Sequence, residues 1–150
     1  MKKKIIITGG LGYIGTELCK LYSGVSWNNE IIIIDNRFIS ERVNQIRNWN
    51  MEFVHGDILD KELINKYCKN ADIIHHLAGI TDVPRTKSES EDKKDEKIKL
   101  VAEEGTQNIL DAINDKCKII FPSTHVVYEG IKKVKNNILE DEDLKPLLSY

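Results

Sequence analysis

Five short apolar runs alternate along the chain with longer segments of helical spacing. The runs predict buried strands, because branched apolar residues follow one another without the polar alternation of a half-exposed strand. They occupy residues 4–7, 30–34, 52–54, 72–76 and 118–121. Apolar positions three and four residues apart predict helices in the intervening segments. These cover residues 12–22, 40–49, 61–68 and 97–114.

The alternation of strands and helices indicates the fold class. Strands joined through helices pair in parallel, and the helices cover both faces of the sheet. We therefore expect a three-layer α/β/α domain with a doubly wound parallel sheet over residues 1–150. Residues 85–99 mix both charges without an apolar period, which predicts a solvated loop leading into an exposed helix start or, alternatively, a flap beside a ligand.

Composition narrows the function classes. The chain has 150 residues, 41% hydrophobic and 31% charged, with a formal net charge of -2, so there is no electrostatic argument for nucleic acid or an anionic membrane. The longest apolar runs have the length of strands, so no membrane span is expected. The apolar stretch at the N-terminus is too short for a signal peptide, so we expect a cytoplasmic protein. The cysteines Cys19, Cys68 and Cys117 are widely spaced, which favours free thiols over a disulfide or zinc site.

The first strand leads into a cluster of glycines, "TGGLGYIG". Gly10, Gly12 and Gly15 fit the pattern G-x-G-x-x-G, and Gly9 opens a looser version of it. Both patterns lie between a strand and a helix, where a backbone without side chains can approach a pyrophosphate and the helix N-terminus offers N–H donors. A glycine-rich turn without function is the alternative.

Asp35 favours the dinucleotide interpretation. It ends the second strand, twenty residues beyond Gly15, where a carboxylate accepts hydrogen bonds from the ribose hydroxyls of an adenosine. The same charge repels a 2′-phosphate, so NAD is favoured over NADP. Arg37 weakens that preference, because an arginine nearby is how such phosphates are accommodated.

Several motifs together resemble a known family. The segments "TGGLGYIG", "HGDILD", "HHLAG", "GTQNIL" and "FPSTHVVYEG" stand in the order and spacing of the extended short-chain dehydrogenase/reductase family, particularly its NAD-dependent nucleotide-sugar epimerases and dehydratases. The resemblance covers the whole chain and implies a Rossmann-like fold.

The resemblance implies a set of cofactor contacts. Asp57 corresponds to an acid that binds the adenine amino group, with Ile58 beside the ring. A helix N-cap is the alternative for Asp57, but Asp60 fits that role better. The implied cofactor-binding residues are Gly9, Gly10, Leu11, Gly12, Tyr13, Ile14, Gly15, Asp35, Asn36, Asp57, Ile58, Leu77, Ala78 and Gly79. The last three match a strand end that passes under the cofactor, for which an ordinary strand end is the alternative. No metal ligands are implied.

The resemblance also implies two catalytic residues. Thr124 matches a Ser/Thr that hydrogen-bonds the sugar hydroxyl undergoing oxidation, although a threonine after a strand is often a turn or cap. Tyr150 matches the proton-transferring tyrosine. A phenol becomes a base when a nearby cation lowers its pKa, and the family's lysine four residues later lies beyond Tyr150. Ala102 replaces the family's asparagine before Gly105 and Thr106.

Two function classes follow. In the first, the chain is the cofactor portion of an NAD-dependent nucleotide-sugar epimerase or dehydratase, truncated before the last strands and the substrate domain, and inactive alone. A reductase of the same family is a variant of it. In the second, the chain is a module that binds a dinucleotide or a partner without catalysis. We expect a nucleotide-sugar substrate for the enzyme, and either a homo-oligomer or a chain that supplies the missing half.

Overall fold

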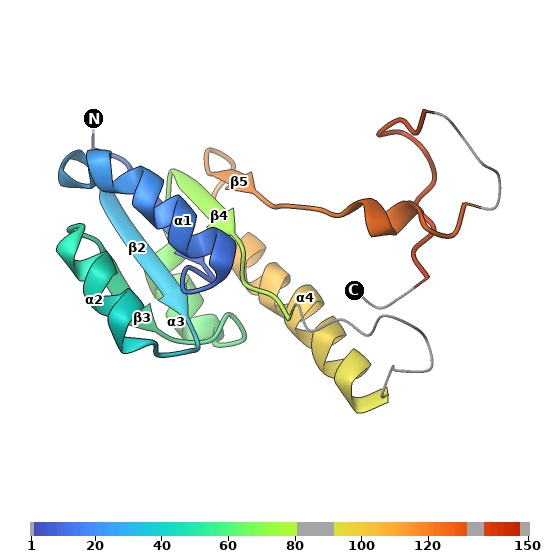
Figure 1. Cartoon of the computed structure of the whole chain (residues 1–150), viewed down its shortest axis with the longest axis horizontal. Coiled ribbons are helices and arrows are strands. Elements are labelled where there is room, and N and C mark those ends of the chain that lie inside the picture. The colour runs from blue at the N-terminus through green and yellow to red at the C-terminus, as the bar shows by residue number, and fades with distance from the viewer. Residues whose placement is uncertain (1, 81–91, 132–136, 148–150) are drawn as a thin grey trace.

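The computed structural model describes residues 2–80, 92–131 and 137–147, and its centre is a parallel β-sheet (Figure 1). The five strands lie in the order β3-β2-β1-β4-β5. Every pair of neighbours is parallel. The strands are β1 (Lys4–Thr8), β2 (Glu30–Asp35), β3 (Glu52–His55), β4 (Ile73–His76) and β5 (Lys118–Ile120).

Helices cover both faces of this sheet. On one face lie α1 (Tyr13–Tyr22) and α2 (Ser40–Asn48), whose buried side chains join one core cluster. On the other face lie α3 (Lys61–Cys68) and α4 (Asp92–Ala112), which join a second cluster. A 3₁₀ helix, η1 (Ser23–Asn28), follows α1. The expected three-layer, Rossmann-like α/β/α fold is confirmed.

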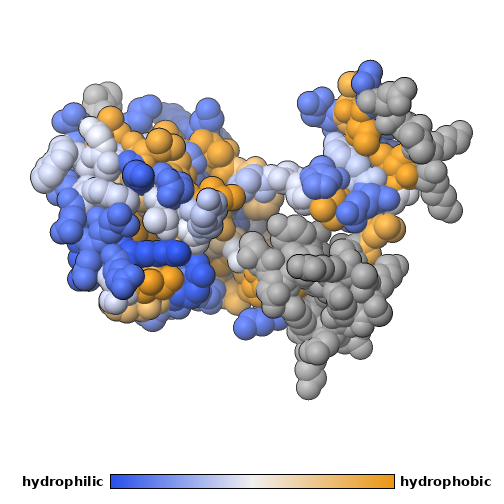
Figure 2. Space-filling model, in the orientation of Figure 1, coloured by the Kyte–Doolittle hydropathy of each residue, from blue (hydrophilic) through white to orange (hydrophobic). Residues whose placement is uncertain are grey.

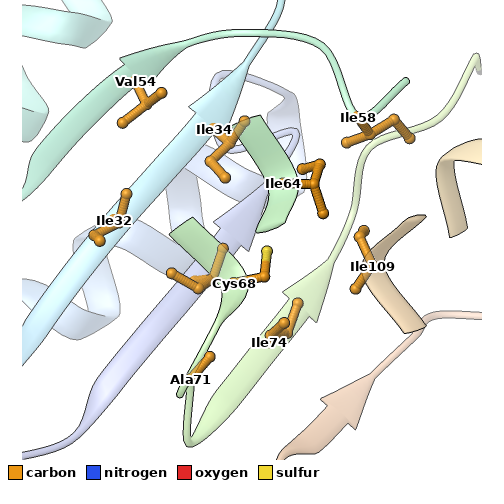
Figure 3. Packing of buried hydrophobic residues seen from close by; sticks show 10 residues of the cluster. Ile32, Ile34, Val54, Ile58, Ile64, Cys68, Ala71, Ile74 and Ile109 are labelled. Carbon is orange, nitrogen blue, oxygen red and sulfur yellow. The ribbon is translucent and has the colours of Figure 1, made fainter. Parts of the chain in front are cut away.

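The isoleucine runs fill both clusters at once. Successive side chains of a strand point to opposite faces, so Ile5 and Ile7 pack under α1 and α2 whereas Ile6 packs under α3 and α4. Figure 3 shows the second cluster, in which Ile64 and Cys68 of α3 lie with Ile109 of α4. The polar alternation of a half-exposed strand is therefore absent from β1, because both of its faces are buried.

The boundary of α4 corrects one expectation. The sequence predicts a helix over residues 97–114 after a solvated loop, but α4 already begins at Asp92 and ends at Ala112. Lysine and glutamate are good helix formers, and Lys99 lies 3.8 Å from Glu103 one turn later. Helical propensity thus extends the helix into a segment that has no apolar period. Residues 85–91 of the expected loop or flap lie outside the described residues.

The chain beyond β5 runs away from the sheet before it turns into the short 3₁₀ helix η3 (His125–Tyr128) (Figure 1). The N–H of Lys145 donates to Val127 O at 2.7 Å, and the N–H of Gly130 donates to Lys145 O at 2.8 Å. Figure 2 shows apolar side chains on the surface of this segment. Exposed apolar residues here are Phe121, Ile138, Leu139, Leu144 and Leu147.

Two expectations about side-chain chemistry concern the described parts of the chain. All three cysteines are free, as expected. Within the ranges given above, no three His, Cys, Asp or Glu side chains are grouped so that they could hold a metal ion. In those same ranges, no helix has the length and apolar character required to cross a bilayer.

Candidate functional site

The candidate site lies at the carboxyl edge of the sheet. Because the strands are parallel and in register, Thr8 lies opposite Ile34 of β2 and opposite His76 of β4. The segments that follow β1, β2, β3 and β4 therefore leave the sheet at one edge. This edge is where open α/β sheets bind their ligands, and it brings together the predicted residues from four distant parts of the sequence.

The glycine loop after β1 is packed tightly against the end of β4. Gly9 has a φ of +69°, in the left-handed region, and a Cβ on it would lie 2.7 Å from the peptide atoms of Leu77 and Ala78. Its N–H donates to Ile34 O at 2.8 Å, and its carbonyl accepts from the Gly12 N–H at 3.0 Å. Only a residue without a side chain fits here without strain.

Two further glycines bring α1 close to the sheet. A Cβ on Gly15 would lie 2.5 Å from Gly9 O, and one on Gly10 would overlap the side chain of Ile33. Gly12 has more room, with Gly9 O 3.1 Å and Arg37 Nη2 3.7 Å from such a Cβ. Gly10 and Gly15 thus allow α1 and its loop to pack closely on the sheet, whereas Gly12 lies on the open side of the loop.

The N-terminus of α1 opens onto the same edge. Gly12 is its N-cap, and no side chain caps this end. The side chains of Tyr13 and Ile14 are 84% and 62% exposed. The first N–H groups of a helix lack intrahelical acceptors and carry its positive dipole end, so this terminus suits an anion.

Hydrogen bonds of Asp35 connect the glycine loop to the end of β2. Its Oδ2 accepts a hydrogen bond from the Leu11 N–H at 2.9 Å. Its Oδ1 accepts from the N–H of Arg37 at 3.0 Å and from Arg37 Nε at 3.3 Å. Asp35 is only 5% exposed, so these contacts hold the carboxylate in one orientation at the loop.

Both backbone polar groups of Leu11 form hydrogen bonds with side chains. Its side chain is fully buried, its N–H is bonded to Asp35, and its carbonyl accepts from Nη1 of Arg42 on α2. The resemblance implies a cofactor contact from Leu11, but in the structure the Leu11 N–H is bonded to Asp35 within the loop. The contact of Arg42 with the Leu11 carbonyl was not expected from the sequence, because nothing in the pattern of α2 distinguishes this arginine from an exposed one.

Asn36 and Asp57 meet beside the ends of β2 and β3. Nδ2 of Asn36 donates to Asp57 Oδ2 at 2.9 Å, and the Leu59 N–H donates to Asp57 Oδ1 at 3.0 Å. The N-cap of α3 is Asp60, which accepts from the Leu63 N–H at 3.0 Å. The alternative role of Asp57 as that N-cap is therefore not observed.

Ile58 contributes its side chain to the core. It is 5% exposed, and a Cβ on Gly105 of α4 would overlap it. Nδ2 of Asn108 donates to Ile58 O at 3.1 Å, so the same helix also holds its backbone. A ligand beside this segment would meet the backbone of Ile58 and the side chain of Asp57.

The end of β4 carries a network that sequence analysis missed. Oγ1 of Thr8 lies 2.8 Å from His76 Nδ1, and His76 Nε2 lies 3.0 Å from Oγ1 of Thr106 on α4. The Ala78 N–H also donates to Thr8 Oγ1, at 3.2 Å. Burial lowers the pKa of His76 to about 4, which keeps the ring neutral at physiological pH. The motifs "HHLAG" and "GTQNIL" supply these residues, but only the fold shows that they meet.

The catalytic residues expected from the resemblance are only partly described. Thr124 is the N-cap of η3, and its Oγ1 accepts from the Val126 N–H at 3.3 Å, so the predicted cap geometry is present. A pocket of about 430 Å³ lies next to it, lined by His125, Tyr128, Glu129 and Ile138. Tyr150 lies outside the described residues.

A sequence model of the 3-beta hydroxysteroid dehydrogenase/isomerase family matches residues 6–146. The chain belongs to this family. A CDP-paratose 2-epimerase from Salmonella typhi is 35% identical over 149 residues, which cover 91% of this chain and 41% of the epimerase. The resemblance to nucleotide-sugar epimerases and dehydratases is thereby confirmed.

Solved structures of family members have the same fold. A UDP-N-acetylglucosamine 4-epimerase from Methanobrevibacter ruminantium M1, in complex with UDP-N-acetylmuramic acid, superimposes with a TM-score of 0.77 at 25% identity, over 100% of this chain and 46% of the epimerase. The dTDP-glucose 4,6-dehydratase DesIV from Streptomyces venezuelae, with NAD bound, gives 0.78 at 25% identity, over 97% and 46%. The chain spans less than half the length of these relatives.

Proposed function

We propose that this chain is the NAD-binding portion of a nucleotide-sugar epimerase or dehydratase. The observation that carries the proposal is the contact between Asp35 and Leu11, which joins the acid at the end of β2 to the glycine loop at the end of β1. A dinucleotide site of this class needs both elements at one edge of the sheet.

The residues at this edge fit a dinucleotide. The uncapped N-terminus of α1 provides N–H donors for the pyrophosphate at Tyr13 and Ile14, and Gly12 lets the chain approach it. We assign Asp35 to the adenosine ribose, where its own charge disfavours a 2′-phosphate. We assign Asp57, whose carboxylate accepts from Asn36 and from the Leu59 N–H, to the adenine amino group.

The remaining predicted contacts follow β4. Leu77 and Ala78 are half-buried against the glycine loop, and Gly79 has open space where a side chain would stand. We assign these residues to the part of the cofactor that passes under the strand end. When bound, NAD would accept a hydride from a sugar carbon in the first step of the reaction.

Thr124 and Tyr150 are assigned to the substrate side. The Thr124 oxygen accepts from the Val126 N–H, which leaves the hydroxyl proton available for the sugar hydroxyl. Tyr150 is assigned as the base for the proton of that hydroxyl. A tyrosine at its ordinary pKa of about 10 is a weak base at neutral pH, so this role requires a nearby cation that lowers the pKa.

Three assignments concern the whole protein. We assign it a nucleotide sugar as substrate and a cytoplasmic location. We also assign it a partner, either a second copy or a chain that completes the enzyme, since Leu100 and Leu110 on α4 are 41% and 48% exposed.

Calorimetric titration with NAD tests the site. The wild-type chain is compared with Asp35→Asn, which keeps the shape of the side chain but removes its charge, and with Asp115→Asn, an exposed control. We expect NAD to bind the wild type and the control alike, and the Asp35 variant at least about tenfold more weakly, because charged hydrogen bonds are lost. Binding that is unaffected by Asp35→Asn, or no binding at all, would reject the proposal.

A further inference from the structure

Arg37 occupies the space between Asp35 and the glycine loop. Its Nε lies 3.3 Å from Asp35 Oδ1, and its Nη2 lies 3.7 Å from the place where a Cβ on Gly12 would stand. The guanidinium therefore extends from the acid of β2 across to the open side of the loop. Its side chain is 55% exposed, whereas that of Asp35 is 3% exposed.

The contacts of Arg37 restrict what Asp35 can offer to a ribose. A carboxylate has about four lone-pair sites, two on each oxygen. Oδ1 already accepts from the N–H and from Nε of Arg37, and Oδ2 accepts from the Leu11 N–H. One site remains, so a ribose that uses both of its hydroxyls on this carboxylate must first displace Nε of Arg37.

The same arrangement changes the charge that a 2′-phosphate would meet. Asp35 contributes one negative charge, which by itself repels a phosphate. Arg37 contributes one positive charge beside it, and Arg42, bonded to Leu11 O, contributes another on the same loop. The local sum is one positive charge. The Arg37 side chain is also more than half exposed, and the fork of N–H donors on its guanidinium matches a phosphate.

We infer that Arg37 is a specificity-determining residue that lets this site bind NADP in addition to NAD. The guanidinium neutralises Asp35 toward a 2′-phosphate and supplies a donor pair for it, whereas for NAD it competes with the ribose hydroxyls. The inference rests on the proposed function, since it requires a dinucleotide at the glycine loop.

The test is calorimetric titration of the full chain with NAD and with NADP, in the wild type and in Arg37→Gln. Arg47→Gln, which removes an exposed arginine from the last turn of α2, controls for the loss of one charge. We expect the wild type to bind NADP within about tenfold of NAD, and Arg37→Gln to bind NADP at least about tenfold more weakly than the wild type does. NAD affinity should be unchanged or higher in this variant, because the competing donor is gone.

The different effects of Arg37→Gln on NADP affinity and on NAD affinity distinguish a role in specificity from a purely structural role. If Arg37 only stabilised the loop, its removal would weaken NAD and NADP equally, and that result would overturn the inference. Wild-type binding of NAD with NADP weaker by more than about tenfold would also overturn it, while leaving the proposed function intact. Absence of binding for both dinucleotides would reject the proposed function and the inference with it.

Discussion

Oγ1 of Thr8 lies 2.8 Å from Nδ1 of His76, so the last residues of two neighbouring strands are joined through their side chains. The Ala78 N–H donates to the Thr8 oxygen, and Thr106 lies at the other ring nitrogen. Every group is satisfied when the Thr8 hydroxyl donates to Nδ1 and Nε2–H donates to Thr106. The neutral histidine thereby connects β1, β4 and α4.

This neutral histidine makes stability depend on pH. Burial lowers the pKa of His76 from 6.5 to about 4 in the folded protein. Between these values the unfolded chain binds a proton that the folded chain does not, so the free energy of unfolding rises with pH. The stabilising contribution is present above pH 6.5 and is lost as the pH falls toward 4. Integrated over this window, it amounts to about 3 kcal/mol.

Urea unfolding across this pH window measures the effect in the wild type and in His76→Asn. We expect a flatter pH dependence in the variant. The slope will not vanish, because burial also lowers the pKa of His75. His125→Asn removes an exposed histidine and should leave the dependence unchanged. Parallel curves for the wild type and His76→Asn would show that His76 is not protonated on unfolding in this range.

Thr106 should be required as the partner of His76. Replacement of Thr106 by Val keeps the shape of the side chain but leaves Nε2–H of a buried ring without an acceptor. We expect a loss of about 1–3 kcal/mol in the free energy of unfolding. Thr106→Ser keeps the hydroxyl and should lose much less. Unchanged stability of Thr106→Val would show that the hydrogen bond to Nε2 makes no net contribution.

Gly9 should tolerate no side chain. Gly9→Ala places a Cβ against the peptide of Leu77 and Ala78 in a left-handed backbone conformation. We expect a loss of about 1–3 kcal/mol in the free energy of unfolding, together with the loss of dinucleotide binding. Gly24→Ala is the matched control, since nothing lies within 4 Å of a Cβ there. Similar stability of both variants in thermal unfolding would contradict the tight loop.

The three thiols should differ in reactivity. Cys19 and Cys68 are fully buried, and burial raises the pKa of each to about 12. Cys117 is less buried, although burial and the charge of Asp72 raise its pKa as well. With a disulfide reagent at about pH 8, we expect one thiol to react before unfolding and two only in denaturant. Cys117→Ser should abolish the early phase. An early phase that persists in this variant would place the accessible thiol elsewhere.

Much of the fold could be predicted because its signals are local. Isoleucine runs such as residues 31–34 are continuous because both faces of a central parallel strand are buried, and this property is visible in the sequence. The start of α4 at Asp92 could not be placed from an apolar period, because charged residues of good helix propensity extend the helix there.

For the site, the sequence by itself determined which backbone segments reach the edge of the sheet. The glycines and Asp35 are recognisable because turn conformation and strand length are properties of neighbouring residues. The contacts of Arg37 with Asp35 and of His76 with Thr106 were decided only by the tertiary structure. Side-chain contacts of this kind depend on rotamers, strand order and helix packing, which bring together residues that no sequence period relates.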